Sequence, residues 1–269
     1  KLDQATVLLG IAVDIAQRYD LPLVVARLAI RAASLLGDRA QYERGLALAE
    51  WATIRYSEAG NSLGQGLAHY IRGLIQCNRG KYVEAVRAFE SVFVHFADLQ
   101  GIDLYIASTW QCLGYLHHKL GRLREAQDCL ARSIKHLPKN ADREAHGRLA
   151  WVRAQLASKC GEADLAAKLY RQALDHMISA DLWVDAAFVA TEWTRLLVSA
   201  EDSADKVRSI IDSLTSLVFP LQDQSPLAAA AFAELIRALM EGKRPSVPML
   251  DSIIMKMESE RPGLSARLA

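Results

Sequence analysis

The chain has 269 residues, of which 51% are hydrophobic and 23% charged, and its formal net charge is +1 at pH 7. This composition is normal for a soluble folded protein. A net charge near zero gives no general attraction to nucleic acid or to an anionic membrane surface, so we expect neither as a direct partner.

Taken in chain order, the first apolar stretch is "TVLLGIAV" at 6–13, which Asp14 interrupts. It is far shorter than the roughly 18–20 residues that span a bilayer, and no small-residue cleavage site follows it. The chain begins with Lys1 instead of Met. We therefore expect a fragment of a longer protein, with a further domain upstream as one alternative.

Signals for β-strands are nearly absent along the whole chain. Apolar residues recur at spacings of three and four, as in "YVEAVRAFESVFVHF" at 82–96, which is the period of an amphipathic helix. Connections are short, so sequential helices should pack antiparallel. The sequence predicts an all-α protein of about thirteen helices, at 3–19, 22–37, 41–59, 62–79, 82–97, 102–120, 123–136, 141–160, 163–179, 181–200, 203–217, 226–241 and 247–258.

The stretch "GNSLG" at 60–64 matches Gly-x-Ser-x-Gly, the turn that presents a nucleophilic serine. That turn requires a preceding strand. Here "LAEWATIRYSEA" precedes it and has helical character, and Asn61-Ser62 suits the start of the next helix. We expect a helix cap at this point and no catalytic serine.

The four cysteines, Cys77, Cys112, Cys129 and Cys160, form no Cys-x-x-Cys pair and have no His at ligand spacing. This distribution argues against a zinc site or a disulfide framework and suits a reducing cytoplasm. His117 and His118 diverge by about 100° on a helix, so they cannot chelate one metal ion. We expect packed thiols, no metal and no cofactor.

One skeleton occurs twice, in "GLIQCNRGKYVEAVRAF" at 73–89 and in "GYLHHKLGRLREAQDCL" at 114–130. Each stretch begins with Gly, has a second Gly seven residues later, and has Glu-Ala four and five residues after that. A third copy has Ala154, Gly161 and Ala166 at the matching positions. Small residues at this spacing let two helices approach closely while a bulky neighbour fills the adjacent hole.

This skeleton resembles the tetratricopeptide repeat, in a variant whose period is 40–41 residues instead of 34. The resemblance implies a right-handed superhelical array of antiparallel helix pairs over a single domain, 1–269. The clearest repeats would be 62–100, 102–138 and 141–179, with degenerate repeats at 22–59 and 181–217 and a C-terminal cap at 225–259. The residues that it assigns to packing between helices are Gly73, Gly80, Ala85, Gly114, Gly121, Ala126, Ala154, Gly161 and Ala166.

In such arrays the first helix of each pair lines a concave groove. The groove positions predicted to bind a partner are Tyr70, Asn78, Gln111, Tyr115, His118, Lys119, Arg148, Trp151, Gln155, Lys159 and Glu192. Aromatic anchors among basic residues favour an acidic segment or a terminal carboxylate. The other interpretation is that the aromatic residues simply pack on neighbouring helices. The Lys/Asn carboxylate clamp of a known subset of the family is absent.

We therefore predict a non-enzymatic, cytoplasmic scaffold that binds a protein or peptide, as the docking or sensing arm of a bacterial regulator. Two alternatives stay open. One is a sensor of a small ligand or signalling peptide that controls an upstream effector domain. The other is an oligomerisation module, of which a homodimer is the simplest form. The stripe of Met249, Ile253 and Met257 is either the inward face of the cap or a dimer contact.

Overall fold

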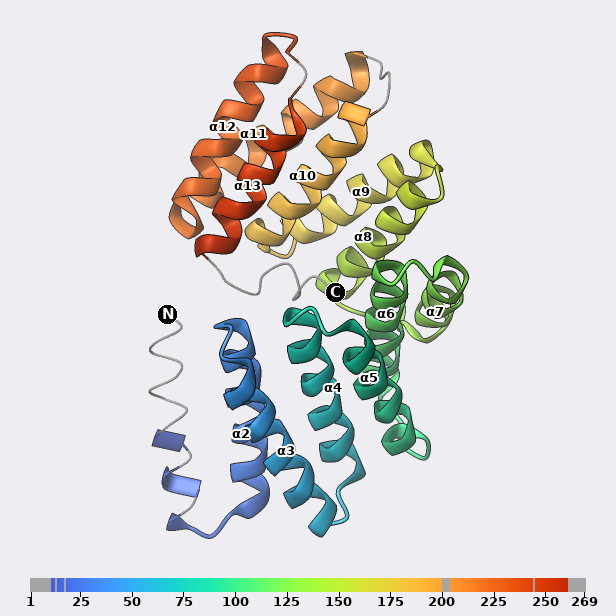
Figure 1. Cartoon of the computed structure of the whole chain (residues 1–269), viewed down its shortest axis with the longest axis vertical. Coiled ribbons are helices and arrows are strands. Elements are labelled where there is room, and N and C mark those ends of the chain that lie inside the picture. The colour runs from blue at the N-terminus through green and yellow to red at the C-terminus, as the bar shows by residue number, and fades with distance from the viewer. Residues whose placement is uncertain (1–10, 13, 17, 200–203, 244, 261–269) are drawn as a thin grey trace. The chain divides into compact units, whose positions relative to one another are not determined.

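The computed structural model describes residues 11–12, 14–16, 18–199, 204–243 and 245–260, and all regular secondary structure in this part of the chain is helical (Figure 1). The expected helix at 3–19 lies largely outside the described residues. The helices whose bounds are defined are α2 (Pro22–Asp38), α3 (Tyr42–Glu58), α4 (Ser62–Asn78), α5 (Tyr82–Phe96), α6 (Asp103–Lys119), α7 (Leu123–His136), α8 (Arg143–Lys159), α9 (Ala163–Ile178), α10 (Trp183–Ser199), α11 (Ala204–Gln224), α12 (Pro226–Met240) and α13 (Val247–Glu260).

These helices confirm the predicted all-α class, and their ends agree closely with the expected ones, apart from the end of α11. We expected α11 to stop at residue 217 because Pro220 lacks the N–H of a helix interior. Instead α11 continues to Gln224 with Pro220 inside it. Leu217 and Leu221 are both fully buried on its inner face, and burial of that face outweighs the one hydrogen bond that the proline removes.

The turns between paired helices repeat one backbone pattern. After α4, Gly80 adopts φ +75°, its N–H bonds the carbonyl of Cys77 at 2.9 Å, and the next N–H, of Lys81, bonds Gln76 at 2.8 Å. This arrangement satisfies carbonyls that a helix end leaves open. The turn after α2 has the same bonding with Ala40 at the left-handed position, φ +57°.

Close helix approach within a pair depends on the first glycine and the alanine of the skeleton. The assignment of the second glycines, Gly80, Gly121 and Gly161, to packing is wrong, because a Cβ there would meet nothing within 4 Å and these residues serve the turns. A Cβ on Gly73 would lie 2.8 Å from the Phe89 ring, and one on Gly114 would lie 2.8 Å from Leu130. The alanines of the skeleton are fully buried as well, namely Ala85, Ala126, Ala154 and Ala166. Bulky side chains of the second helix thus occupy the space that these small residues leave.

The chain divides into two compact units, residues 1–138 and 139–268. In the first unit, α2 pairs with α3, α4 with α5, and α6 with α7, and α4 also contacts both helices of the preceding pair. In the second unit, α8 pairs with α9, α10 contacts α9 and α11, and α12 contacts α11 and α13. The continuity of the chain as one domain, 1–269, stays a prediction.

The last helix, α13, packs against both α10 and α12. Its side chains Ile253 and Met257 are buried, whereas Met255 on the opposite face is exposed. Of the stripe that the sequence left open between an inward face and a dimer contact, Ile253 and Met257 thus point inward, and Met249 is half-buried. An exposed carboxylate, Asp251, forms an ion pair with Arg195 of α10.

Candidate functional site

The predicted groove residues of the first unit differ in exposure. Gln111 and Tyr115 on α6 are buried, with 6% and 5% of their surface exposed. The Tyr70 ring packs edge-on against Phe89, with ring centroids 5.3 Å apart. Lys119 is exposed and its Nζ lies 5.0 Å from the centroid of the Tyr115 ring. The Lys119 side chain therefore lies over the Tyr115 ring. The rings of Tyr70 and Tyr115 are largely occupied by contacts with other residues of the chain.

In the second unit, two predicted groove residues meet at the carboxylate of a third, Glu192 on α10. The indole N–H of Trp151 donates to Oε2 at 2.7 Å. The amide of Gln155, one helical turn further along α8, donates to both carboxylate oxygens at 2.9 Å. Tyr170 of α9 adds a longer contact from its hydroxyl at 3.5 Å. We call Trp151, Gln155, Tyr170 and Glu192 the Glu192 cluster.

The electrostatics of the Glu192 cluster agree with this bonding. Burial, followed by the nearby negative charge of Glu192 and the hydrogen bond to it, raises the pKa of Tyr170, so that its hydroxyl stays protonated as a donor. Trp151 is 3% exposed and Gln155 is 6% exposed. The indole N–H is the only polar hydrogen of Trp151, and it is used by Glu192. The hydrogen bond therefore serves packing between helices.

The groove positions thus separate by exposure into three groups in the described structure. Gln111, Tyr115, Trp151 and Gln155 are buried, so in this conformation they do not present the surface that we expected. The half-buried positions are Tyr70, Asn78, His118, Arg148 and Glu192, and the exposed ones are Lys119 and Lys159. Partner binding by this set stays a prediction.

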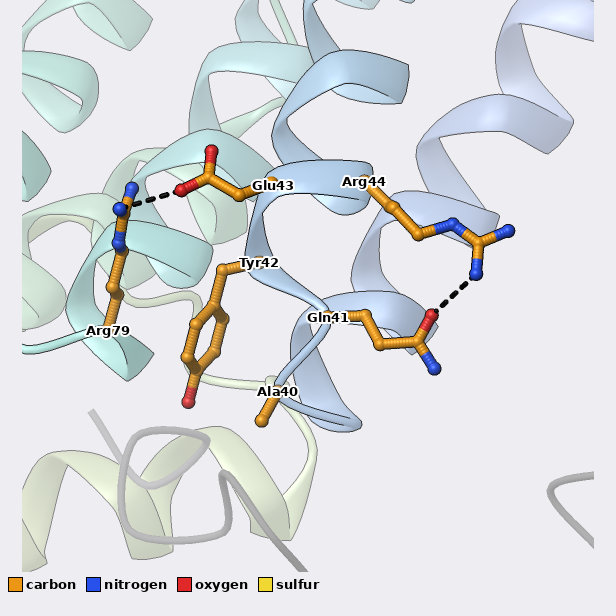
Figure 2. Close-up of a pocket in the computed structure, with 6 residues that line it drawn as sticks. All are labelled: Ala40, Gln41, Tyr42, Glu43, Arg44 and Arg79. Carbon is orange, nitrogen blue, oxygen red and sulfur yellow. Dashed lines mark hydrogen bonds and ion pairs between the residues drawn. The ribbon is translucent and has the colours of Figure 1, made fainter.

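A solvent-open pocket in the first unit lies outside the predicted groove set (Figure 2). It has a volume of about 350 Å³ and lies where the first turn of α3 meets the C-terminal end of α4. Its lining residues are Ala40, Gln41, Tyr42, Glu43, Arg44 and Arg79. We call it the two-arginine pocket.

The side chains of the two-arginine pocket are held by local contacts. An Nη of Arg79 pairs with Glu43 at 2.7 Å, and an Nη of Arg44 donates to Gln41 at 2.9 Å, as Figure 2 shows. The Tyr42 hydroxyl donates to the carbonyl of Asn78 at 3.3 Å, which joins the start of α3 to the end of α4. Each guanidinium has five N–H donors, and each of these contacts uses one of them.

The same place in the next repeat has a different charge. Residues 82–85 follow 42–45 by 40 positions, so Tyr82 matches Tyr42 and Glu84 matches Arg44. Arg79, the residue just after α4, is matched by Leu120, just after α6. Aligning the repeats by their turns would have singled out this pair of arginines. Neither arginine lies among the predicted groove positions of the first helices, so the groove pattern did not indicate this pocket.

The structure also places the motifs that we rejected as chemical sites. Ser62 is the first residue of α4 and follows the helix α3, and Asn61 is the cap, its side chain accepting the N–H of Gly64 at 2.8 Å. In the described part of the chain no group of three or more His, Cys, Asp or Glu side chains could hold a metal ion. None of the described helices combines the length and apolar character needed to cross a membrane.

Three of the four cysteines are buried and one, Cys160, is exposed. The expectation of four packed thiols is therefore wrong for Cys160, which is the residue that follows the last turn of α8. Burial raises the pKa of Cys77 to about 12 and that of Cys129 to about 11. Both thiols stay protonated near neutral pH, which makes them poor nucleophiles.

Known proteins were compared with this chain by sequence and by structure. No family model matches the sequence, and no curated protein matches it either. Among solved structures, the chain is similar to that of BtubC (BKLC) from P. vanneervenii, with 13% identity, a TM-score of 0.56, and 91% of this chain and 94% of that chain covered.

A second solved structure is YrrB, described as a TPR protein with an unusual peptide-binding site. It shares 20% identity with this chain at a TM-score of 0.43, and the match covers 74% of this chain and 91% of that one. At these identities the likeness is one of fold, and it is the match to BtubC that supports it. Together with the repeated helix pairs and their glycine turns, it confirms a tetratricopeptide-like helical-repeat fold.

Proposed function

We propose that this tetratricopeptide-like chain is a scaffold that binds an acidic segment of a partner protein, with the two-arginine pocket as a point of contact. The observation that carries the proposal is the pocket itself, a volume of about 350 Å³ with Arg44 and Arg79 in its wall. Helical-repeat folds present side chains from successive repeats to extended partners, so one pocket serves as an anchor along a longer contact.

The chemistry of the pocket favours a carboxylate over other groups. A planar guanidinium matches the two oxygens of a carboxylate in a bidentate arrangement. The pocket holds two such groups and one carboxylate, Glu43, so its lining has a formal charge of +1. Tyr42 adds an aromatic ring beside Arg79, whereas the Arg44 side chain extends on the other side, toward Gln41 (Figure 2). Tyr and Arg are residue types that contribute strongly to binding at interfaces.

The wider role is a docking or sensing arm of a longer regulatory protein, as the resemblance to repeat arrays led us to predict. The exposed cation Lys119, in the same unit, lies near the C-terminal end of α6. It would favour the same class of acidic partner through long-range attraction. The absence of catalytic activity and the cytoplasmic location remain predictions.

An array of immobilised peptides would test the proposal. Twelve-residue peptides of acidic, neutral and basic composition would be exposed to the wild-type chain and to an Arg44→Gln/Arg79→Gln variant. We expect the wild type to prefer acidic peptides and the variant to lose that preference. Equal binding of all three classes by the wild type would contradict the proposed function.

A further inference from the structure

We infer that Glu43 is a built-in competitor, whose carboxylate occupies in the free protein the position on Arg79 that a partner's carboxylate takes on binding. The inference rests on the proposed function and concerns its regulation. Glu43 lies in the lining of the two-arginine pocket and pairs with Arg79 through Oε1 at 2.7 Å. No other lining residue is acidic.

The geometry makes Glu43 a displaceable ligand. Its side chain is 76% exposed, whereas that of Arg79 is 36% exposed. Arg79 is thus the less exposed partner of the pair, and the Glu43 carboxylate extends further into solvent. An exposed ion pair of this kind is weak, because solvent screens it and two long side chains must be ordered to form it. An incoming carboxylate would lose little by breaking the pair, and Glu43 would move into solvent.

Glu43 lies in the first turn of α3, as Glu84 lies in the first turn of α5, but the two acids hold different positions in the repeat. Acidic residues stabilise the first turn of a helix. In the next repeat, the acidic residue in the first turn of α5 is Glu84. Glu84 matches Arg44 by position, while Glu43 matches Val83. The repeat skeleton therefore does not require an acid at position 43. Its contact with Arg79 is a feature of this pocket.

A Glu43 that competes for Arg79 affects the affinity for an acidic ligand, which a purely structural ion pair would not do. Glu43→Gln removes the competing charge, so an acidic ligand should bind about two- to fivefold more tightly, the range expected from an exposed pair. Arg79→Gln should weaken the same ligand. Glu84→Gln changes the net charge by the same amount away from the pocket and is the matched control.

The experiment is fluorescence anisotropy of the full chain with a labelled hexapeptide of alternating glutamate and glycine. Wild type, E43Q, R79Q and E84Q would be compared at 50 mM salt, with melting temperatures confirming that each is folded. We expect E43Q to tighten binding, R79Q to weaken it and E84Q to match the wild type.

The outcomes separate the two proposals. If R79Q weakens binding but E43Q does not strengthen it, the competitor role is wrong and the binding function stands. Equal tightening in E43Q and E84Q would assign the effect to net charge and would also overturn the competitor role. If neither wild type nor E43Q binds the acidic peptide, the proposed function itself fails.

Discussion

The indole N–H of Trp151 lies 2.7 Å from Oε2 of Glu192, across 41 residues of sequence. The amide of Gln155 shares the same carboxylate, so two donors of α8 are fixed by one acceptor of α10. Buried donors without an acceptor are costly. We therefore expect the Glu192 cluster to stabilise the second unit by joining α8 to α10.

Glu192→Leu should lower the free energy of unfolding by about 2–4 kcal/mol, because it leaves the buried donors of Trp151 and Gln155 without their acceptor. Urea denaturation followed by tryptophan fluorescence would measure this loss. Glu234 is exposed on α12 of the same unit, and Glu234→Leu should change stability by less than about 0.5 kcal/mol. Equal small effects in the two variants would show that the cluster contributes nothing.

The stacked pair of His69 and His95 should make stability depend on pH. Their rings lie 5.1 Å apart at an angle of 12°. Burial, then the positive charge of Arg72 and the neighbouring His95, lowers the pKa of His69 from 6.5 to about 4. Between these values the unfolded chain binds more protons than the folded one, so stability is lost as pH falls through this window.

His69→Phe keeps an aromatic ring in the stack and removes the titrating group. We expect the wild type to lose about 1–2 kcal/mol more than this variant between pH 7 and pH 4, after allowing for the partial exposure of His69. Urea unfolding at a series of pH values would measure both curves. Parallel curves would mean that His69 does not titrate differently in the folded chain.

Gly73→Ala should destabilise the first unit by overpacking. The new Cβ would lie 2.8 Å from the ring of Phe89, a ring that is fully buried and has little room to move. Such overpacking typically costs about 1–3 kcal/mol. Thermal melts of Gly73→Ala and of Gly73→Ala/Phe89→Leu would test the contact, since the smaller leucine should recover part of the loss. Additive effects of the two substitutions would contradict it.

Ala40→Gly should stabilise the chain by about 1 kcal/mol, because Ala40 occupies a left-handed conformation that disfavours a Cβ. Its φ is +57°, whereas that of Ala59, next to the following turn, is −91°. Ala59→Gly is therefore the control and should be neutral or destabilising. Differential scanning calorimetry of both variants would decide, and a lower melting temperature for Ala40→Gly would contradict the strain argument.

The fold was predictable because it depends on local, periodic signals. The helical spacing of apolar residues and the turn glycines such as Gly80 located the helices and their pairing. The end of α11 was not predictable, because the rule for Pro220 is local while the burial of Leu217 and Leu221 depends on other helices. At such a position, tertiary packing outweighs the low helix propensity of proline.

The candidate site was less predictable than the fold. Spacing placed Trp151 and Gln155 on one helix face, but the hydrogen bonds that satisfy them go to Glu192, which another helix supplies. The two-arginine pocket depends likewise on two elements, the start of α3 and the end of α4. The periodicity of one helix does not show which residues of another helix it will contact, so it predicted neither the Glu192 cluster nor the two-arginine pocket.

The most direct test of the central claim is amide chemical-shift mapping of the isotope-labelled chain titrated with the glutamate–glycine hexapeptide. If the two-arginine pocket binds acidic segments, the largest shifts will fall at residues 40–44 and at Arg79, and they will disappear in an Arg44→Gln/Arg79→Gln variant. Shifts concentrated instead at groove positions such as Tyr70 and Lys119, or none at all, would contradict the assignment of the acidic partner to this pocket.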